Sequence, residues 1–100
     1  MSLFLLMTRL GPESVHDAAG RRAMGKAWLD KVHETCPDVK FIAHYALLGP
    51  YDFMDVYEAP DVETAQLVSL ISRSEGALNA ESWPAIPYEG FLKKLESIQP

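Results

Sequence analysis

A histidine and an aspartate on two neighbouring strand-like segments form the pair best suited to acid–base chemistry. His44 lies in segment 39–48 and Asp55 in segment 51–59, and Gly49-Pro50 between them is a hairpin signal. If the loop is symmetric, the two residues lie opposite each other, about 5 Å apart. The carboxylate would then hold one tautomer of the imidazole, and His44 could act as a general base. The alternative is a polar cross-strand pair that fixes the register, and a one-residue bulge would break the pairing.

Four further side chains are candidates for binding a small apolar or aromatic ligand. Tyr51 could donate a hydrogen bond to a ligand oxygen, or it could simply pack beside the turn. Tyr57 and Trp83 could form walls against a planar ligand, and they are equally suited to a core or an interface. Glu81 is expected on the same side of the sheet as Trp83.

Alternation along residues 51–58 assigns these side chains to one face of the sheet. Met54 and Val56 suit contacts with helices, whereas the other alternate set is aromatic with one acid. We therefore expect that second set on the face without helices: Tyr51, Phe53, Asp55 and Tyr57. Glu81 and Trp83 would share this face, and the residues turned toward the helices would be Leu78, Ala80 and Ile86.

No metal ion or cofactor is predicted. A metal site would have to combine His44, Asp55 and Glu81 from three strands, and no ligand spacing such as H-E-x-x-H is present. The single Cys36 excludes an internal disulfide and a cysteine-based zinc site. Without a G-x-G-x-x-G motif or a P-loop, nucleotide binding has no support.

The composition predicts one soluble domain over residues 1–100. Fourteen acidic and nine basic residues give a net charge of −5, which argues against a nucleic-acid partner. The dense cationic spot is Arg21-Arg22 with Lys26. The apolar run 3–7 is too short to span a membrane and is interpreted as a buried strand, so no membrane partner is expected. One cysteine is typical of a reducing cytoplasm, the expected location.

Gly, Pro and capping residues divide the chain into strands and helices. Ser14 and Asp61 are the expected N-caps of the first two helices, which Pro37 and Gly76 would end. Pro84 suits an edge strand. The expected strands are 2–10, 39–48, 51–59 and 77–86, and the expected helices are 14–36, 62–74 and 88–97.

The order β-α-β-β-α-β followed by a short helix predicts an α+β, ferredoxin-like fold. Right-handed crossovers would put the first two helices on one face of the sheet. On the first helix, Arg22 falls on the apolar side, where its stem can pack while its head reaches water. Gly25 in mid-helix costs about 1 kcal/mol relative to Ala and indicates a close approach to the sheet or to a partner.

The other face of the sheet would be bare and rich in aromatic residues, which is unfavourable unless something covers it. The simplest cover is a second copy of the chain, which gives a homodimer of the dimeric α/β-barrel type. Two facing sheets would enclose a space whose lining is expected to include His44, Asp55, Tyr57 and Trp83.

The hairpin resembles the signature of the GYD-domain family, which is named for a Gly, Tyr, Asp motif. Gly49, Tyr51 and Asp52 match the three named residues, and Glu58-Ala59-Pro60-Asp61 matches the end of the following strand. The resemblance covers roughly residues 3–91. It implies a ferredoxin-like fold of the dimeric α/β-barrel type, with no established activity and no catalytic residues to carry over. Gly49 and Asp52 are taken as structural, with Asp52 accepting backbone N–H bonds at the turn.

The sequence departs from this family at Asp55 and Tyr57, where aliphatic residues are more typical. Related barrel families include cofactor-independent monooxygenases, isomerases, haem enzymes and effector-binding domains, so the fold does not choose the function. We predict a homodimer that binds a small, partly aromatic or apolar molecule between sheet and helices. One alternative is a cofactor-independent monooxygenase or isomerase that uses His44 and Asp55. The other is a purely structural dimer module.

Overall fold

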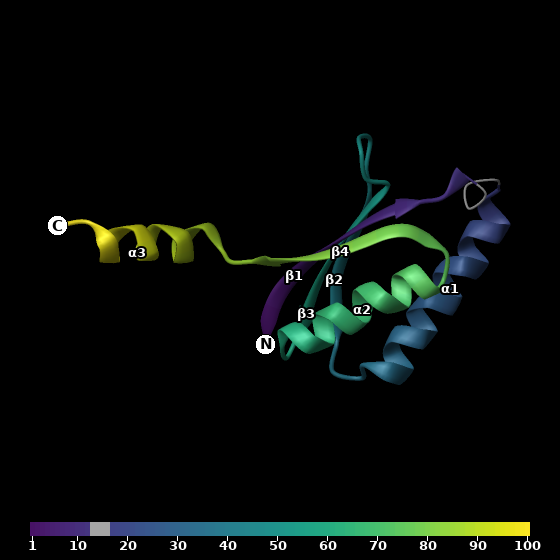
Figure 1. Ribbon diagram of the computed structural model, residues 1–100, viewed down its shortest axis with the longest axis horizontal. Coiled ribbons are helices and arrows are strands. Elements are labelled where there is room, and N and C mark those ends of the chain that lie inside the picture. The colour runs from purple at the N-terminus through teal and green to yellow at the C-terminus, as the bar shows by residue number, and fades with distance from the viewer. Residues whose placement is uncertain (13–16) are drawn as a thin grey trace.

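The computed structural model describes residues 1–12 and 17–100, and the elements follow the predicted order (Figure 1). The strands are β1 (Ser2–Leu10), β2 (Lys40–Ala46), β3 (Phe53–Ala59) and β4 (Ala77–Ala85). The helices are α1 (Ala18–Thr35), α2 (Val62–Ser74) and α3 (Tyr88–Ile98). Both hairpin strands are shorter than expected, because the connection between β2 and β3 spans residues 47–52.

In the described part of the chain, four strands form one antiparallel sheet in the order β2-β3-β1-β4. Helices α1 and α2 lie on the same face of this sheet (Figure 1). The predicted α+β, ferredoxin-like fold is therefore confirmed. β4 is an edge strand, as Pro84 indicated, since a proline lacks the N–H that a second neighbour would require. Among the described helices, none has the length and apolar character needed to cross a membrane.

Local capping chemistry sets the helix ends. Asp61 accepts a hydrogen bond from the Thr64 backbone N–H at 2.8 Å and caps α2, as predicted. After α2, Gly76 has φ 108°, a conformation that side chains with a Cβ rarely adopt. The predicted cap Ser14 lies outside the described residues. α1 instead begins at Ala18, and its N-cap is Asp17.

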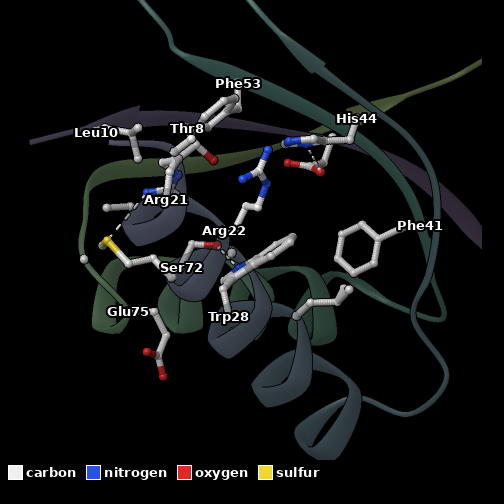
Figure 2. A pocket seen from close by; sticks show the side chains of 17 residues that line it. Thr8, Leu10, Arg21, Arg22, Trp28, Phe41, His44, Phe53, Ser72 and Glu75 are labelled. Atoms are coloured by element: carbon white, nitrogen blue, oxygen red, sulfur yellow. Dashed lines mark hydrogen bonds and ion pairs between the residues drawn. The ribbon is translucent and has the colours of Figure 1, made fainter. Parts of the chain in front are cut away.

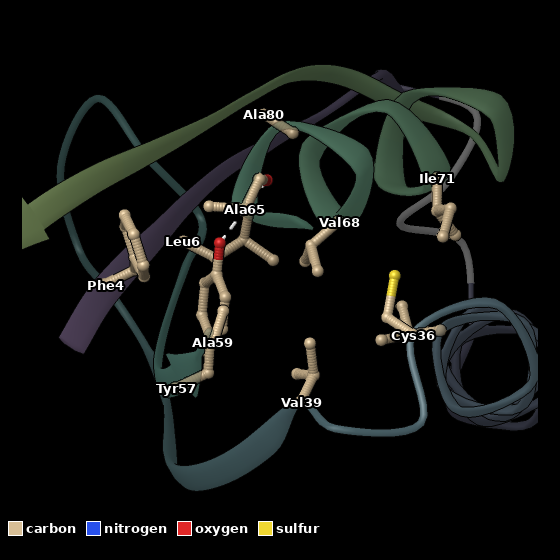
Figure 3. Close-up of a cluster of buried hydrophobic side chains, with 11 residues drawn as sticks. Phe4, Leu6, Cys36, Val39, Tyr57, Ala59, Ala65, Val68, Ile71 and Ala80 are labelled. Atoms are coloured by element: carbon tan, nitrogen blue, oxygen red, sulfur yellow. Dashed lines mark hydrogen bonds between the residues drawn. The ribbon is translucent and has the colours of Figure 1, made fainter. Parts of the chain in front are cut away.

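The core lies between the sheet and the two crossover helices (Figure 3). β1 contributes Phe4 and Leu6, and Tyr57 stacks on Phe4 with ring centroids 5.6 Å apart. The helices contribute the buried residues Val32, Ala65, Val68 and Ile71. Cys36, which follows α1, is a buried free thiol.

The predicted face of β3 was wrong. Tyr57 is fully buried and Asp55 is 5% exposed, and both face the helices, whereas Met54 and Val56 lie on the other face. Tyr57 tolerates this position because its hydroxyl finds partners in the core. Its oxygen lies 2.7 Å from Ser82 Oγ and 3.4 Å from the backbone oxygen of Ala65, to which it donates.

β4 follows the prediction in part. Ala80 is buried against the helices, and Glu81 and Trp83 lie on the opposite face, as expected. Leu78 was expected to face the helices but is 64% exposed, because the pairing with β1 skips this residue in a bulge. Ile86 also misses the core: it lies beyond β4, and its side chain lies beside Gly90 of α3.

The face of the sheet without helices carries apolar side chains, including Leu5, Met54, Val56 and the exposed Tyr45. Beyond it, α3 extends away from the body of the molecule at the far end of β4 (Figure 1). α3 is amphipathic, and Phe91 and Ile98 on it are exposed. Both surfaces are apolar regions that the crossover helices leave uncovered.

Candidate functional site

Strand register gathers chemically active side chains on the helix-covered face of the sheet. His44 lies opposite Asp55, and Asp55 lies opposite Leu6 on β1. The pairing expected from the hairpin is therefore confirmed. Two residues further along β3 on the same face, Phe53 lies opposite Thr8 of β1, which gives a second cross-strand row beside that of His44, Asp55 and Leu6. Because residues opposite each other in a sheet share a face, both rows turn toward α1 and α2.

The first half of α1 does not close onto these rows, and the space beneath it is a cavity of about 570 Å³ (Figure 2). α1 reaches the core through its C-terminal half, where Val32 is buried. At Gly25, an added Cβ would meet no atom within 4 Å, so the predicted close approach to the sheet was wrong, while the alternative approach to a partner stays a prediction. The cavity is lined mainly by apolar and aromatic side chains, among them Leu10, Trp28, Leu29, Phe41 and Phe53.

His44 and Asp55 form a close pair at the wall of this cavity. His44 Nδ1 lies 2.6 Å from Asp55 Oδ1, and the imidazole is tilted against the Phe53 ring with centroids 5.2 Å apart. The Asp55 side chain is 6% exposed, whereas that of His44 is 58% exposed. The carboxylate is therefore the buried partner, and the imidazole stands between it and the open space.

Burial dominates the electrostatics of Asp55. Desolvation raises the pKa of this carboxyl above its ordinary value, and the charge and hydrogen bond of His44 oppose the rise. With its proton on Nδ1, His44 donates to Asp55 and keeps Nε2 as a free acceptor. This arrangement can take up a proton from a molecule in the cavity, which is the chemistry of a general base.

Residues of α1 complete the site, and sequence reasoning did not assign them to it. Arg21 and Arg22 line the cavity, and the Arg21 guanidinium lies over the Phe53 ring at 5.4 Å. Trp28 packs against Phe41 with ring centroids 5.1 Å apart. The available signal was Arg22 on the predicted apolar side of the helix, and in the structure this exposed residue lines the cavity.

The other expected ligand-binding residues lie elsewhere. Tyr51, Glu81 and Trp83 meet on the helix-free face, so they do not share a site with Asp55. Tyr51 and Trp83 each donate a hydrogen bond to Glu81 at 2.9 Å, and Asn79 donates a third at 2.8 Å. The bond from Trp83 contributes most to lowering the pKa of Glu81. With three donors on one carboxylate, this cluster ties the hairpin to β4.

Tyr57 does not wall the cavity, because it lies in the core between β3 and α2. Burial raises the pKa of Tyr57 to about 12, so its hydroxyl stays protonated at neutral pH. The set once considered for a metal, His44, Asp55 and Glu81, is split between the two faces of the sheet. Within residues 1–12 and 17–100, no group of three or more His, Cys, Asp or Glu side chains could hold a metal ion.

Asp52 connects the hairpin to β1. Its Oδ2 accepts a hydrogen bond from the Leu10 backbone N–H at 2.7 Å, and its own N–H donates to the Thr8 carbonyl at 2.8 Å. The expected acceptor role of Asp52 is therefore present, although the donor belongs to β1 and not to the turn. Gly49 has no atom within 4 Å of an added Cβ, so it meets no steric demand from neighbouring residues.

The sheet order and the two helices on one face define an α+β, ferredoxin-like protein with a cavity beneath its first helix. A family model described as GYD domain matches residues 4–95, nearly the whole chain. The chain therefore belongs to the GYD domain family, as the hairpin motif indicated.

Two proteins from Thermus thermophilus are similar to this chain. One is named glutamine synthetase and cystathionine beta-lyase binding protein and is 38% identical over 58 residues. The match covers 58% of this chain and 61% of that relative, so the chain spans less than two thirds of the relative's length. The other is the crystal structure of TTHA0845, with a TM-score of 0.58 and 24% identity over 87% of this chain and 95% of that one. This second likeness shows the fold alone.

Proposed function

We propose that the cavity beneath α1 binds a small, partly aromatic or apolar molecule, and that the chain is a binding protein. The observation that carries this proposal is the cavity itself, about 570 Å³ with a mainly apolar lining. Protein interiors are otherwise close-packed, and pockets of several hundred Å³ with a few polar groups are typical of ligand sites. His44, Asp55 and Thr8 supply such polar groups here.

The test is to fill the cavity. Gly25→Phe places a ring in the space where an added Cβ meets nothing, whereas Gly25→Ala adds one methyl group and serves as the control. A panel of small aromatic compounds would be screened by protein-observed NMR. We expect compounds that shift Trp28 and Phe41 resonances in the wild type and in Gly25→Ala but not in Gly25→Phe. If no compound shows this pattern, the cavity is not a binding site and a purely structural dimer is favoured.

A second candidate function, a cofactor-independent monooxygenase or isomerase, is favoured by the 2.6 Å contact between His44 and Asp55. In that case His44 removes a proton from a bound molecule, with Asp55 holding its tautomer. The test compares the wild type with His44→Gln on each compound that binds, with oxygen uptake and product formation as readouts. Turnover that disappears in His44→Gln while binding persists supports the enzyme, and turnover that persists removes His44 as the base.

The same proposal includes a second copy of the chain on the helix-free face of the sheet. The apolar side chains there, Leu5, Met54 and Val56, are only half-buried within one chain. Met54→Lys puts a charge on this face, and Leu70→Lys, on the exposed side of α2, is the matched control. Sedimentation equilibrium at micromolar concentration is expected to give a dimer for the wild type and Leu70→Lys, and a monomer for Met54→Lys. A monomeric wild type would contradict this part of the proposal.

The name of the Thermus relative describes a binding role whose partners are two enzymes. That name supports a binding function for this chain and makes a protein partner the alternative to a small molecule. Sedimentation velocity of the chain mixed with glutamine synthetase separates the two. A complex that forms equally with the wild type and with Gly25→Phe would assign the partner to a surface outside the cavity.

A further inference from the structure

The cavity has a charge pattern that narrows the class of its ligand. Two arginines on neighbouring positions of α1 line it, although the chain as a whole carries a net charge of −5. Ion pairs within residues 1–12 and 17–100 are limited to Lys26 with Asp30 and His44 with Asp55. Neither Arg21 nor Arg22 is therefore neutralised by a described acid.

The two acids in the lining do not compensate these arginines. The Asp55 carboxylate is buried against His44, which occupies one of its oxygens. Figure 2 shows the Glu75 carboxylate pointing away from Arg22 and His44, toward the outside of the cavity. Among the residues that the structure describes, the cavity lining thus offers a ligand two arginines, while Asp55 is paired with His44 and Glu75 points away.

The two arginines have different surroundings. Arg21 lies over the Phe53 ring and donates to Met24 Sδ at 3.8 Å, so its guanidinium already has contacts within the chain. Figure 2 shows the Arg22 side chain extending from α1 into the cavity, toward the side where His44 and Phe53 lie. Arg22 is therefore the cation available to a ligand.

The apolar part of the lining indicates what the anion is attached to. Trp28 is held in place by a hydrogen bond from its Nε1 to Ser72 Oγ at 2.6 Å, and Phe41 packs against its ring. Phe53 forms a further aromatic wall above Arg22 (Figure 2). Fixed aromatic rings bind flat apolar groups well, because both surfaces lose water and little side-chain freedom is lost.

From this geometry we infer that the ligand is a planar aromatic carboxylate, which places its ring between Trp28, Phe41 and Phe53 and its carboxylate on Arg22. A guanidinium binds a carboxylate through two parallel N–H···O bonds, which an uncharged group cannot reproduce. The inference rests on the proposed function, since it names the ligand class of the same cavity.

Two matched compounds test it: naphthalene-2-carboxylate and the uncharged naphthalene-2-carboxamide. Isothermal titration calorimetry would measure both on the wild type, on Arg22→Gln and on Lys31→Gln. Lys31 lies exposed on the same helix and outside the cavity lining, so Lys31→Gln removes the same charge without touching the site. We expect the wild type and Lys31→Gln to bind the carboxylate at least tenfold more tightly than the carboxamide. Arg22→Gln is expected to lose this preference and keep its affinity for the carboxamide within threefold.

The possible outcomes distinguish a failure of the carboxylate site at Arg22 from a failure of the proposed ligand-binding function. If wild type binds both compounds equally, or if Arg22→Gln keeps the preference for the carboxylate, the anion site is refuted while the binding cavity stands. If neither compound binds the wild type, the binding of flat aromatic molecules fails, and the inference fails with it. If Lys31→Gln loses as much preference as Arg22→Gln, the effect belongs to the net charge of the protein, and Arg22 is not the anchor.

Discussion

Replacing Gly25 by alanine is expected to stabilise the protein, because this residue lies inside α1 and borders the cavity. An alanine in a helix interior is favoured over glycine by about 0.8–1 kcal/mol. The new Cβ would meet no atom within 4 Å, so neither a clash nor new packing changes this value. For a domain of this size, the gain corresponds to a rise in Tm of about 3–8 °C.

Urea denaturation followed by circular dichroism measures the change, with both proteins compared at equal concentration so that dimerisation contributes equally, and repeated at a second concentration to detect it. Gly76→Ala is the control with the opposite sign. Gly76 has φ 108°, where a Cβ is strained, so its replacement is expected to cost about 1 kcal/mol or more. A loss of stability in Gly25→Ala would mean that α1 lies against the sheet or a partner in solution. Contact with the sheet would refute the cavity and the function built on it, and a dependence of the loss on protein concentration would point to a partner instead.

Three further changes test the positions assigned to individual side chains. Tyr57→Phe removes the hydroxyl that lies 2.7 Å from Ser82 Oγ and is expected to lower the free energy of unfolding by about 1 kcal/mol in urea; no change would mean that this hydroxyl is not buried. Asp52→Ala leaves the Leu10 N–H without its acceptor and is expected to cost about 1–2 kcal/mol in the same assay, with ligand binding retained; lost binding in the folded variant would give Asp52 a role in the site. Burial raises the pKa of Asp55, so the folded state binds more protons than the unfolded state above the ordinary value of 3.8, and stability contributed by this group falls as pH rises. The unfolding free energy of the wild type minus that of Asp55→Asn should therefore decrease from pH 4 toward neutrality, and an increase would refute the burial of this carboxylate.

Local signals predicted the fold because the chemistry behind each is complete within a few residues. Asp61 caps α2 by accepting a hydrogen bond from the backbone N–H of Thr64, three residues later, and Gly76 follows α2 with a positive φ. The N-cap of α1, in contrast, could not be predicted from local signals. Asp and Ser are about equally good N-caps, so the sequence offers no basis for choosing between Asp17 and a residue one turn earlier.

The candidate site was predicted in part, for a reason that lies in the geometry of a sheet. Cross-strand pairing depends on register, so His44 was correctly placed opposite Asp55 whichever way the pair faced. The face itself depends on tertiary contacts. β1 is apolar on both faces, so its pattern does not indicate which face the helices cover. Tyr57 can be buried because Ser82 and the Ala65 carbonyl lie within hydrogen-bonding distance of its hydroxyl. Those partners come from β4 and α2, so no pattern within β3 reports them.

Features that reduce stability are concentrated at the cavity. Gly25 weakens the middle of α1, burial disfavours the charged form of Asp55, and Arg22 places a charge in a mainly apolar lining. Each of these residues has a replacement that would make the folded state more stable: an alanine for Gly25, an amide for Asp55 and an aliphatic residue for Arg22. Elsewhere the chain follows local rules, as the cap of α2 and the edge position of Pro84 show. The proposed ligand site would account for finding these features around one cavity, whereas a purely structural module predicts no such clustering.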